Sequence, residues 1–112
     1  MQGVVDIAAV LASISEPWKP RDLVSANDAV IRVARLRGEF PWHAHDEDEL
    51  FLCWEGSFRI ELEGRAAAQL EPGQLYVVPR GIRHRPVADR DAITLLIEPS
   101  KTLQYGNPSL PT

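Results

Sequence analysis

Hydrophobic positions follow two different periods along this chain. Near the N-terminus, apolar residues recur at helical spacing over residues 6–14, and Asp6 can cap the first exposed backbone N–H groups, which predicts a short amphipathic helix. Its stripe consists of Ile7, Val10, Leu11 and Ile14. Pro17 and Pro20 cannot continue a helix, and after them the apolar runs become short and are separated by Gly, Pro or acidic turns.

These short runs predict strands. The clearest turn is Asn27-Asp28, which joins two of them into a hairpin. The predicted strands outside the segment 38–56 are Leu23–Val24, Ala29–Arg37, Ser57–Leu62, Ala66–Leu70, Leu75–Val78 and Ala92–Glu98. Short strands without a second helical period indicate an all-β fold, an antiparallel sandwich or barrel rather than a βαβ sheet.

Length and composition fit a single domain over residues 1–112, with a barrel core at about residues 18–100 and an extended tail at 101–112. The net charge of -4 gives no reason to expect nucleic acid as a partner. No stretch approaches the roughly 18–20 apolar residues that cross a bilayer, so we expect no membrane partner. One cysteine, Cys53, excludes an internal disulfide framework, and the cytoplasm is the expected location.

The candidate chemistry is concentrated in two stretches, 38–56 and 73–84, which contain all three histidines of the chain. Side chains at i and i+2 of a strand share a face, so His43 and His45 can present both imidazoles to one point. After the acidic turn 46–48, Glu49 can face the same interior, and His84 would supply the remaining ligand. Three imidazoles and one carboxylate suit a divalent transition metal, whether Fe, Mn, Ni, Co, Cu or Zn, and leave positions open for a small-molecule ligand.

The strand that follows the histidines is apolar on both faces. Glu49, Phe51 and Cys53 share the inward parity, while Leu50, Leu52 and Trp54 occupy the other face. An apolar outer face needs a cover, and a homodimer is the simplest one.

The two stretches resemble the paired motifs of the cupin superfamily. The first motif, G-x5-H-x-H-x3or4-E-x6-G, is matched from His43 to Gly56, with Gly38 one residue closer than usual. The second, G-x5-P-x-G-x2-H-x3-N, is matched in register from Gly73 to His84, with Ala88 in place of the final Asn. Further landmarks resemble small single-domain bacterial cupins of the mannose-6-phosphate-isomerase-like group, which implies a jelly-roll-like antiparallel β-barrel, an ion in its mouth and a dimer.

Reactions vary widely within that superfamily, so three hypotheses stay open. The first is a metalloenzyme that acts on a small oxygen-rich, anionic metabolite as an isomerase, lyase or dioxygenase. The second is a metal-dependent binding or sensing module without turnover, and the third is a barrel whose metal is purely structural.

Other residues have both a functional and a plain interpretation. Tyr76 is a candidate acid/base, although strand tyrosines usually pack; Cys53 is expected to be inert core. Trp42 and Trp54 are expected to be packing or interface residues rather than to bind substrate. Three arginines flank the second motif and could form a cationic rim, although pairing with the acidic residues 46–48 is the favoured interpretation; they are Arg80, Arg83 and Arg85.

Overall fold

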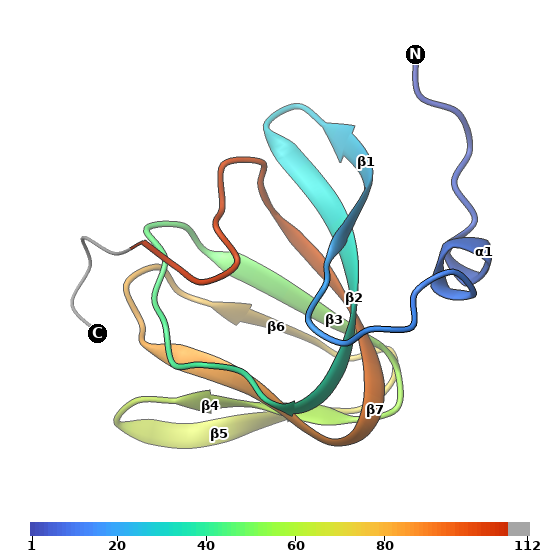
Figure 1. Cartoon of the computed structure of the whole chain (residues 1–112). Coiled ribbons are helices and arrows are strands. Elements are labelled where there is room, and N and C mark those ends of the chain that lie inside the picture. The colour runs from blue at the N-terminus through green and yellow to red at the C-terminus, as the bar shows by residue number, and fades with distance from the viewer. Residues whose placement is uncertain (108–112) are drawn as a thin grey trace.

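The computed structural model describes residues 1–107 as a β-barrel with one short helix beside it (Figure 1). The elements are α1 (Ile7–Leu11), β1 (Arg21–Ala26), β2 (Ala29–Glu39), β3 (Glu49–Glu55), β4 (Phe58–Leu62), β5 (Arg65–Leu70), β6 (Leu75–Val78) and β7 (His84–Pro99). Every strand pairing is antiparallel. The predicted all-β antiparallel fold is confirmed.

Strand β7 lies at the centre of the sheet. The strand order is β1-β2-β7-β3-β6, and β4 pairs with both β5 and β7. The sequence predicts the C-terminal half of this strand, but β7 begins at His84, and its first residues pair with β4. One long strand therefore connects the second motif to the core of the barrel.

The predicted hairpin is present, with Asn27 in the left-handed region at φ 53°. The helix is shorter than expected: Asp6 accepts a hydrogen bond from the Ala8 N–H as its N-cap, but the helix ends at Leu11. Ser13 donates its hydroxyl hydrogen to the Val10 carbonyl. Such a side-chain bond competes with continuation of the helix.

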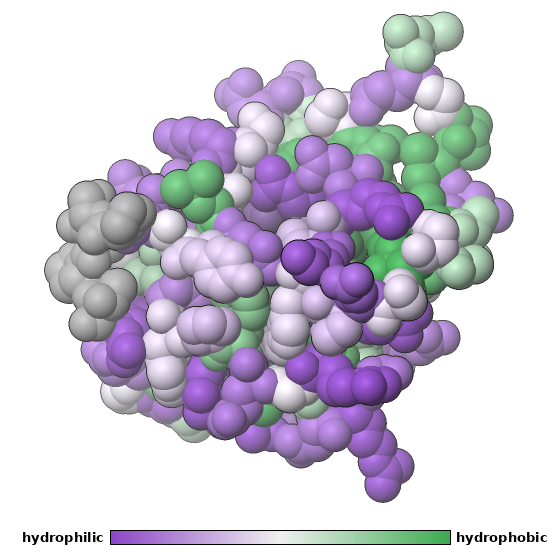
Figure 2. Space-filling model, in the orientation of Figure 1, coloured by the Kyte–Doolittle hydropathy of each residue, from purple (hydrophilic) through white to green (hydrophobic). Residues whose placement is uncertain are grey.

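The sheet carries one hydrophobic cluster on each of its two faces. One fills the barrel and includes Phe51, Phe58, Ile60 and Leu70. The other lies outside, where the apolar stripe of α1 packs against residues of β2 and β7 such as Val33 and Leu95. The stripe therefore docks on the barrel of its own chain. Figure 2 shows a largely hydrophilic face on which hydrophobic side chains gather near α1.

Alternation along β3 follows the predicted parity. Glu49, Phe51 and Cys53 are buried, Leu50 and Leu52 are half-buried, and Trp54 is exposed. Within residues 1–107, no helix is long and apolar enough to cross a membrane.

The C-terminal segment (residues 100–107) does not run extended as predicted. It contains two turns, closed by the Thr102 N–H to the Pro99 carbonyl and the Gly106 N–H to the Leu103 carbonyl. It then folds back to the loop before β3, where the Asn107 N–H donates to the Ala44 carbonyl at 2.9 Å (Figure 1). The rest of the predicted tail, residues 108–112, lies outside the described residues.

Candidate metal centre and adjoining cavity

The four predicted ligand residues come together inside the barrel. One donor atom from each of His43, His45, Glu49 and His84 lies within 4.8 Å of the others, and all four residues are buried. Glu47 is not part of this group, although it is also buried. The arrangement could hold a metal ion.

Main-chain pairing brings the two sequence stretches into contact. The His43 N–H donates to the His84 carbonyl at 3.0 Å, and the His84 N–H donates back to the His43 carbonyl at 2.8 Å. The Gly81 N–H adds a bond of 2.7 Å to the His45 carbonyl. Glu49 begins β3 opposite Val78 of β6. The backbone therefore fixes the relative positions of all four side chains.

Two of the imidazoles are oriented by main-chain carbonyls. His43 Nδ1 lies 2.9 Å from the Pro41 carbonyl oxygen, and His84 Nδ1 lies 2.8 Å from that of Ile82. These contacts assign the hydrogen to Nδ1 and leave Nε2 as the lone-pair donor, the arrangement that metal-ligating histidines commonly show. His84 Nε2 is 3.3 Å from Glu49 Oε1.

Burial keeps the imidazoles neutral. Together with the neighbouring imidazoles, it lowers the pKa of His43 and of His45 to about 4. Burial also lowers the pKa of His84. A metal-ligating histidine must present an unprotonated nitrogen, so the three imidazoles can bind an ion at neutral pH without first losing protons, whereas burial raises the pKa of Glu49.

His45 provides the test of whether these residues fit a metal. Both of its ring nitrogens are buried, and neither has a hydrogen-bond partner among residues 1–107. Buried polar atoms are rarely left unpaired in native proteins. Glu49 Oε1 is 3.7 Å from His45 Nδ1, too far for a hydrogen bond but suitable for two ligands of one ion. The donor set therefore fits a divalent transition metal.

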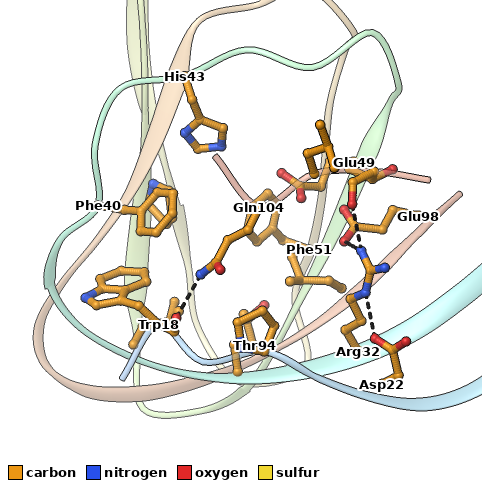
Figure 3. A pocket seen from close by; sticks show the side chains of 17 residues that line it. Trp18, Asp22, Arg32, Phe40, His43, Glu49, Phe51, Thr94, Glu98 and Gln104 are labelled. Atoms are coloured by element: carbon orange, nitrogen blue, oxygen red, sulfur yellow. Dashed lines mark hydrogen bonds and ion pairs between the residues drawn. The ribbon is translucent and has the colours of Figure 1, made fainter. Parts of the chain in front are cut away.

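A cavity of about 290 Å³ adjoins this group (Figure 3). His43 and Glu49 form part of its wall. Much of the remaining wall is apolar or aromatic, and the ring centroids of Trp18 and Phe40 are 5.0 Å apart. Gln104, from the C-terminal segment, lies in the middle of the view and donates to the Trp18 carbonyl at 2.8 Å. A small molecule in the cavity would lie next to the metal group.

Sequence reasoning missed a charged cluster in the same wall. Arg32 donates to Asp22 at 2.8 Å and to Glu98 Oε1 at 2.7 Å. Burial, together with the nearby Glu49, raises the pKa of Glu98 to about 8. Strand parity is the sequence pattern that could have indicated this cluster. Arg32 and Ala34 are two residues apart in β2, so both side chains face the interior of the barrel.

Tyr76 lies on the inward parity of β6, opposite Phe51. It packs against the apolar cluster inside the barrel and is not among the residues that line the cavity. This placement supports packing rather than the acid/base role. Cys53 is fully buried, and burial raises the pKa of its thiol, in agreement with an inert core cysteine.

The arginines near His84 pair with acids other than those expected. Arg83 pairs with Glu63 at 3.0 Å, and Arg85 pairs with Glu39 and Glu61. Both guanidinium groups also lie over the Trp42 ring, about 5 Å from its centroid. The prediction of pairing with residues 46–48 is wrong for these two side chains. Glutamates on neighbouring strands lie closer to them.

An antiparallel β-barrel with three buried histidines and one glutamate beside an internal cavity is the combination that defines a cupin-type metal site. The Cupin_2 family, described as a cupin domain, matches residues 30–98. The chain belongs to this family.

Comparisons with individual proteins agree with this assignment. The crystal structure of a cupin-2 domain containing protein from Shewanella frigidimarina has a TM-score of 0.82 and 32% identity, over 86% of this chain and 94% of the other. The protein YdbB of Bacillus subtilis is 28% identical over 88% of each chain. An acireductone dioxygenase of Picosynechococcus is 30% identical over 70% of this chain but only 51% of its own length.

Proposed function

We propose that this cupin is a metalloenzyme that acts on a small oxygen-containing metabolite. The ion would be a divalent transition metal, Fe, Mn, Ni, Co, Cu or Zn, held by the four-residue group. The observation that carries the proposal is the convergence of four buried donor atoms at the wall of an internal cavity. An ion bound there supplies Lewis-acid chemistry, or oxygen chemistry in the case of iron, which corresponds to isomerase, lyase or dioxygenase activity.

The chain's own residues would bind and orient the substrate. The Pro41 and Ile82 carbonyls hold two imidazoles in place, and His43 and Glu49 contribute to both the metal group and the cavity wall. A purely structural metal would be closed off by its ligands, so a cavity beside the group favours a functional ion. The similarity to an acireductone dioxygenase supports the oxygenase alternative. Membership of the mannose-6-phosphate-isomerase-like group stays a prediction.

Metal content tests the site directly. We expect purified wild-type protein to contain about one metal ion per chain by elemental analysis, and His45→Ala and Glu49→Gln to lose it. Glu47→Gln is the matched control, because Glu47 is also buried but lies outside the group. Full metal content in the His45 and Glu49 variants would contradict the assignment.

The second candidate is a metal-dependent binding module without turnover. The observation in its favour is that the charged cluster of the cavity wall is engaged within itself, because Arg32 pairs with both Asp22 and Glu98. This alternative predicts that a ligand raises the thermal stability of the metal-loaded protein while no product forms.

We also propose a homodimer formed through the outer face of β3 and β6. Leu75 and Val77 are 62% and 46% exposed on the parity that faces away from the barrel interior. Within the described residues β6 pairs with β3 alone, so its other edge is available for a partner strand. Light scattering should show a dimer for wild type and a monomer for Val77→Lys. Ala67→Lys on the exposed part of β5 is the control and should remain dimeric.

A further inference from the structure

Two buried polar atoms in the cavity wall have no partner within residues 1–107. They are Glu98 Oε2 and Thr102 Oγ1, and each residue is 5% exposed. Glu98 also lies beside Glu49 of the metal group, so the corner adjoins that group directly. Both residues line the cavity beside the metal group. An unsatisfied buried polar group costs about 1–3 kcal/mol, so a cavity wall that retains two of them requires an explanation.

The two residues share a corner of the cavity because Arg32 binds both. Arg32 Nη1 donates to Glu98 Oε1 at 2.7 Å and to the Thr102 carbonyl at 3.2 Å. Its Nε and Nη2 groups are used by Asp22 and by the Ser100 carbonyl. Figure 3 shows Arg32 between Asp22 and Glu98 on one side of the cavity. Four of the five guanidinium N–H groups are therefore used, and the unpartnered atoms of the corner are a carboxyl oxygen and a hydroxyl.

A hydroxyl group is the chemical match for this corner. It donates one hydrogen bond and accepts others, so it pairs with a carboxyl group in either protonation state and with a threonine hydroxyl. An anionic group fits poorly, because the Arg32 guanidinium is already engaged by Asp22 and Glu98. The opposite wall, with Trp18 and Phe40, suits a planar apolar body.

We propose that Glu98 and Thr102 form a subsite for a hydroxyl group of the ligand, so that the cavity takes a small hydroxylated aromatic molecule. One end of the molecule would bind the metal through oxygen, and the ring would lie against Trp18 and Phe40. The inference rests on the proposed function, because the metal fixes one end of the ligand. The cavity of about 290 Å³ is at the small end of ligand sites, which limits the ligand to about one ring.

A set of four probes tests the subsite in the zinc-loaded full chain. Benzohydroxamic acid supplies the metal-binding group and the ring, and its 2-, 3- and 4-hydroxy derivatives place one hydroxyl at different positions. We expect at least one derivative to bind about tenfold more tightly than the parent in calorimetry, which is the effect of one well-placed hydrogen bond to a polar buried group.

Two variants test whether the gain in affinity comes from contact of the probe's hydroxyl group with Thr102 and Glu98. Thr102→Val keeps the side-chain shape and removes an unpartnered hydroxyl, so it should fold normally and reduce the gain at least about threefold. Glu98→Gln keeps an oxygen for Arg32 and should also reduce the gain. Thr94→Val is the control for the chemical change, because Thr94 lines the same cavity while its hydroxyl is already bonded to the Leu95 carbonyl at 2.9 Å.

The outcomes separate this inference from the proposed function. If zinc and the parent probe bind but no hydroxylated derivative gains affinity, the subsite is refuted and the metal site stands. An equal gain in wild type, Thr102→Val and Glu98→Gln would also refute the subsite, since the hydroxyl would then bind elsewhere. If zinc does not bind at all, the proposed function itself fails.

Discussion

Gly106→Ala should weaken the attachment of the C-terminal segment and disturb the metal group. Gly106 has φ +84°, and a Cβ there would overlap the Ala44 carbonyl oxygen and lie 3.1 Å from His43 Cβ. Ala44 lies between His43 and His45, two members of the candidate metal group. Relief of the overlap requires the segment to move away from the very backbone that positions His43 and His45.

The magnitude follows from three terms. An L-residue in the left-handed region costs about 1–2 kcal/mol. Displacement of the segment also endangers the Asn107 N–H bond to the Ala44 carbonyl and the Asp46 N–H bond to Asn107 Oδ1, at about 1 kcal/mol each. Gly106→Ala should therefore lower the free energy of unfolding by about 3–4 kcal/mol.

Gly64→Ala is the matched control, since Gly64 has φ +76° with nothing within 4 Å of the added Cβ. It should cost only the backbone term, about 1–2 kcal/mol. Urea unfolding of the metal-free proteins measures both values, and zinc titration shows whether only Gly106→Ala also weakens metal binding. Equal losses of stability in the two variants would refute the claim that the segment is fixed against Ala44.

Further predictions concern charge. Below about pH 6.5, the unfolded chain binds protons that buried His43 and His45, with pKa values of about 4, do not bind, so the metal-free protein should lose stability as the pH falls. Glu98 acts in the opposite direction from about pH 4.5 to 8, because the folded protein keeps a proton there that the unfolded chain has lost. Above about pH 6.5 the two histidines no longer outweigh this effect, so stability should fall as the pH rises. Urea midpoints across pH 4.5–8.5 should show a maximum, and a flat profile would contradict these assignments. Arg32→Met should lower the free energy of unfolding by about 2–3 kcal/mol, because it leaves the buried Glu98 carboxyl without the hydrogen bond that Arg32 donates; Arg32→Met with Glu98→Leu should recover most of this in the same assay.

The metal group was predictable because its information is local. Strand parity placed His43 and His45 together, and the motif matched from His43 to Gly56 includes Glu49. The inward parity of β3 was likewise correct from alternation alone. The apolar stripe of α1 indicated a docking face, but only the structure shows that the face is on the barrel of the same chain.

The Arg32 cluster was not predictable in the same way because its partners are distant in sequence. Arg32 meets Glu98 and the carbonyls of Ser100 and Thr102 only when β2 and β7 pair. The course of residues 100–107 depends equally on such contacts, above all that with Ala44. Prolines and a glycine in a terminal stretch indicate the absence of regular structure, and they do not indicate whether the stretch packs.

The reciprocal main-chain hydrogen bonds between His43 and His84 have a consequence for the order of folding. Contacts between residues far apart in sequence form only after the intervening chain has been closed into a loop. A growing chain that has not yet reached residue 84 offers the ion only part of the group. The chain should therefore reach its full metal affinity only when the barrel closes. From then on, the free energy of metal binding adds to the free energy of unfolding of the whole domain.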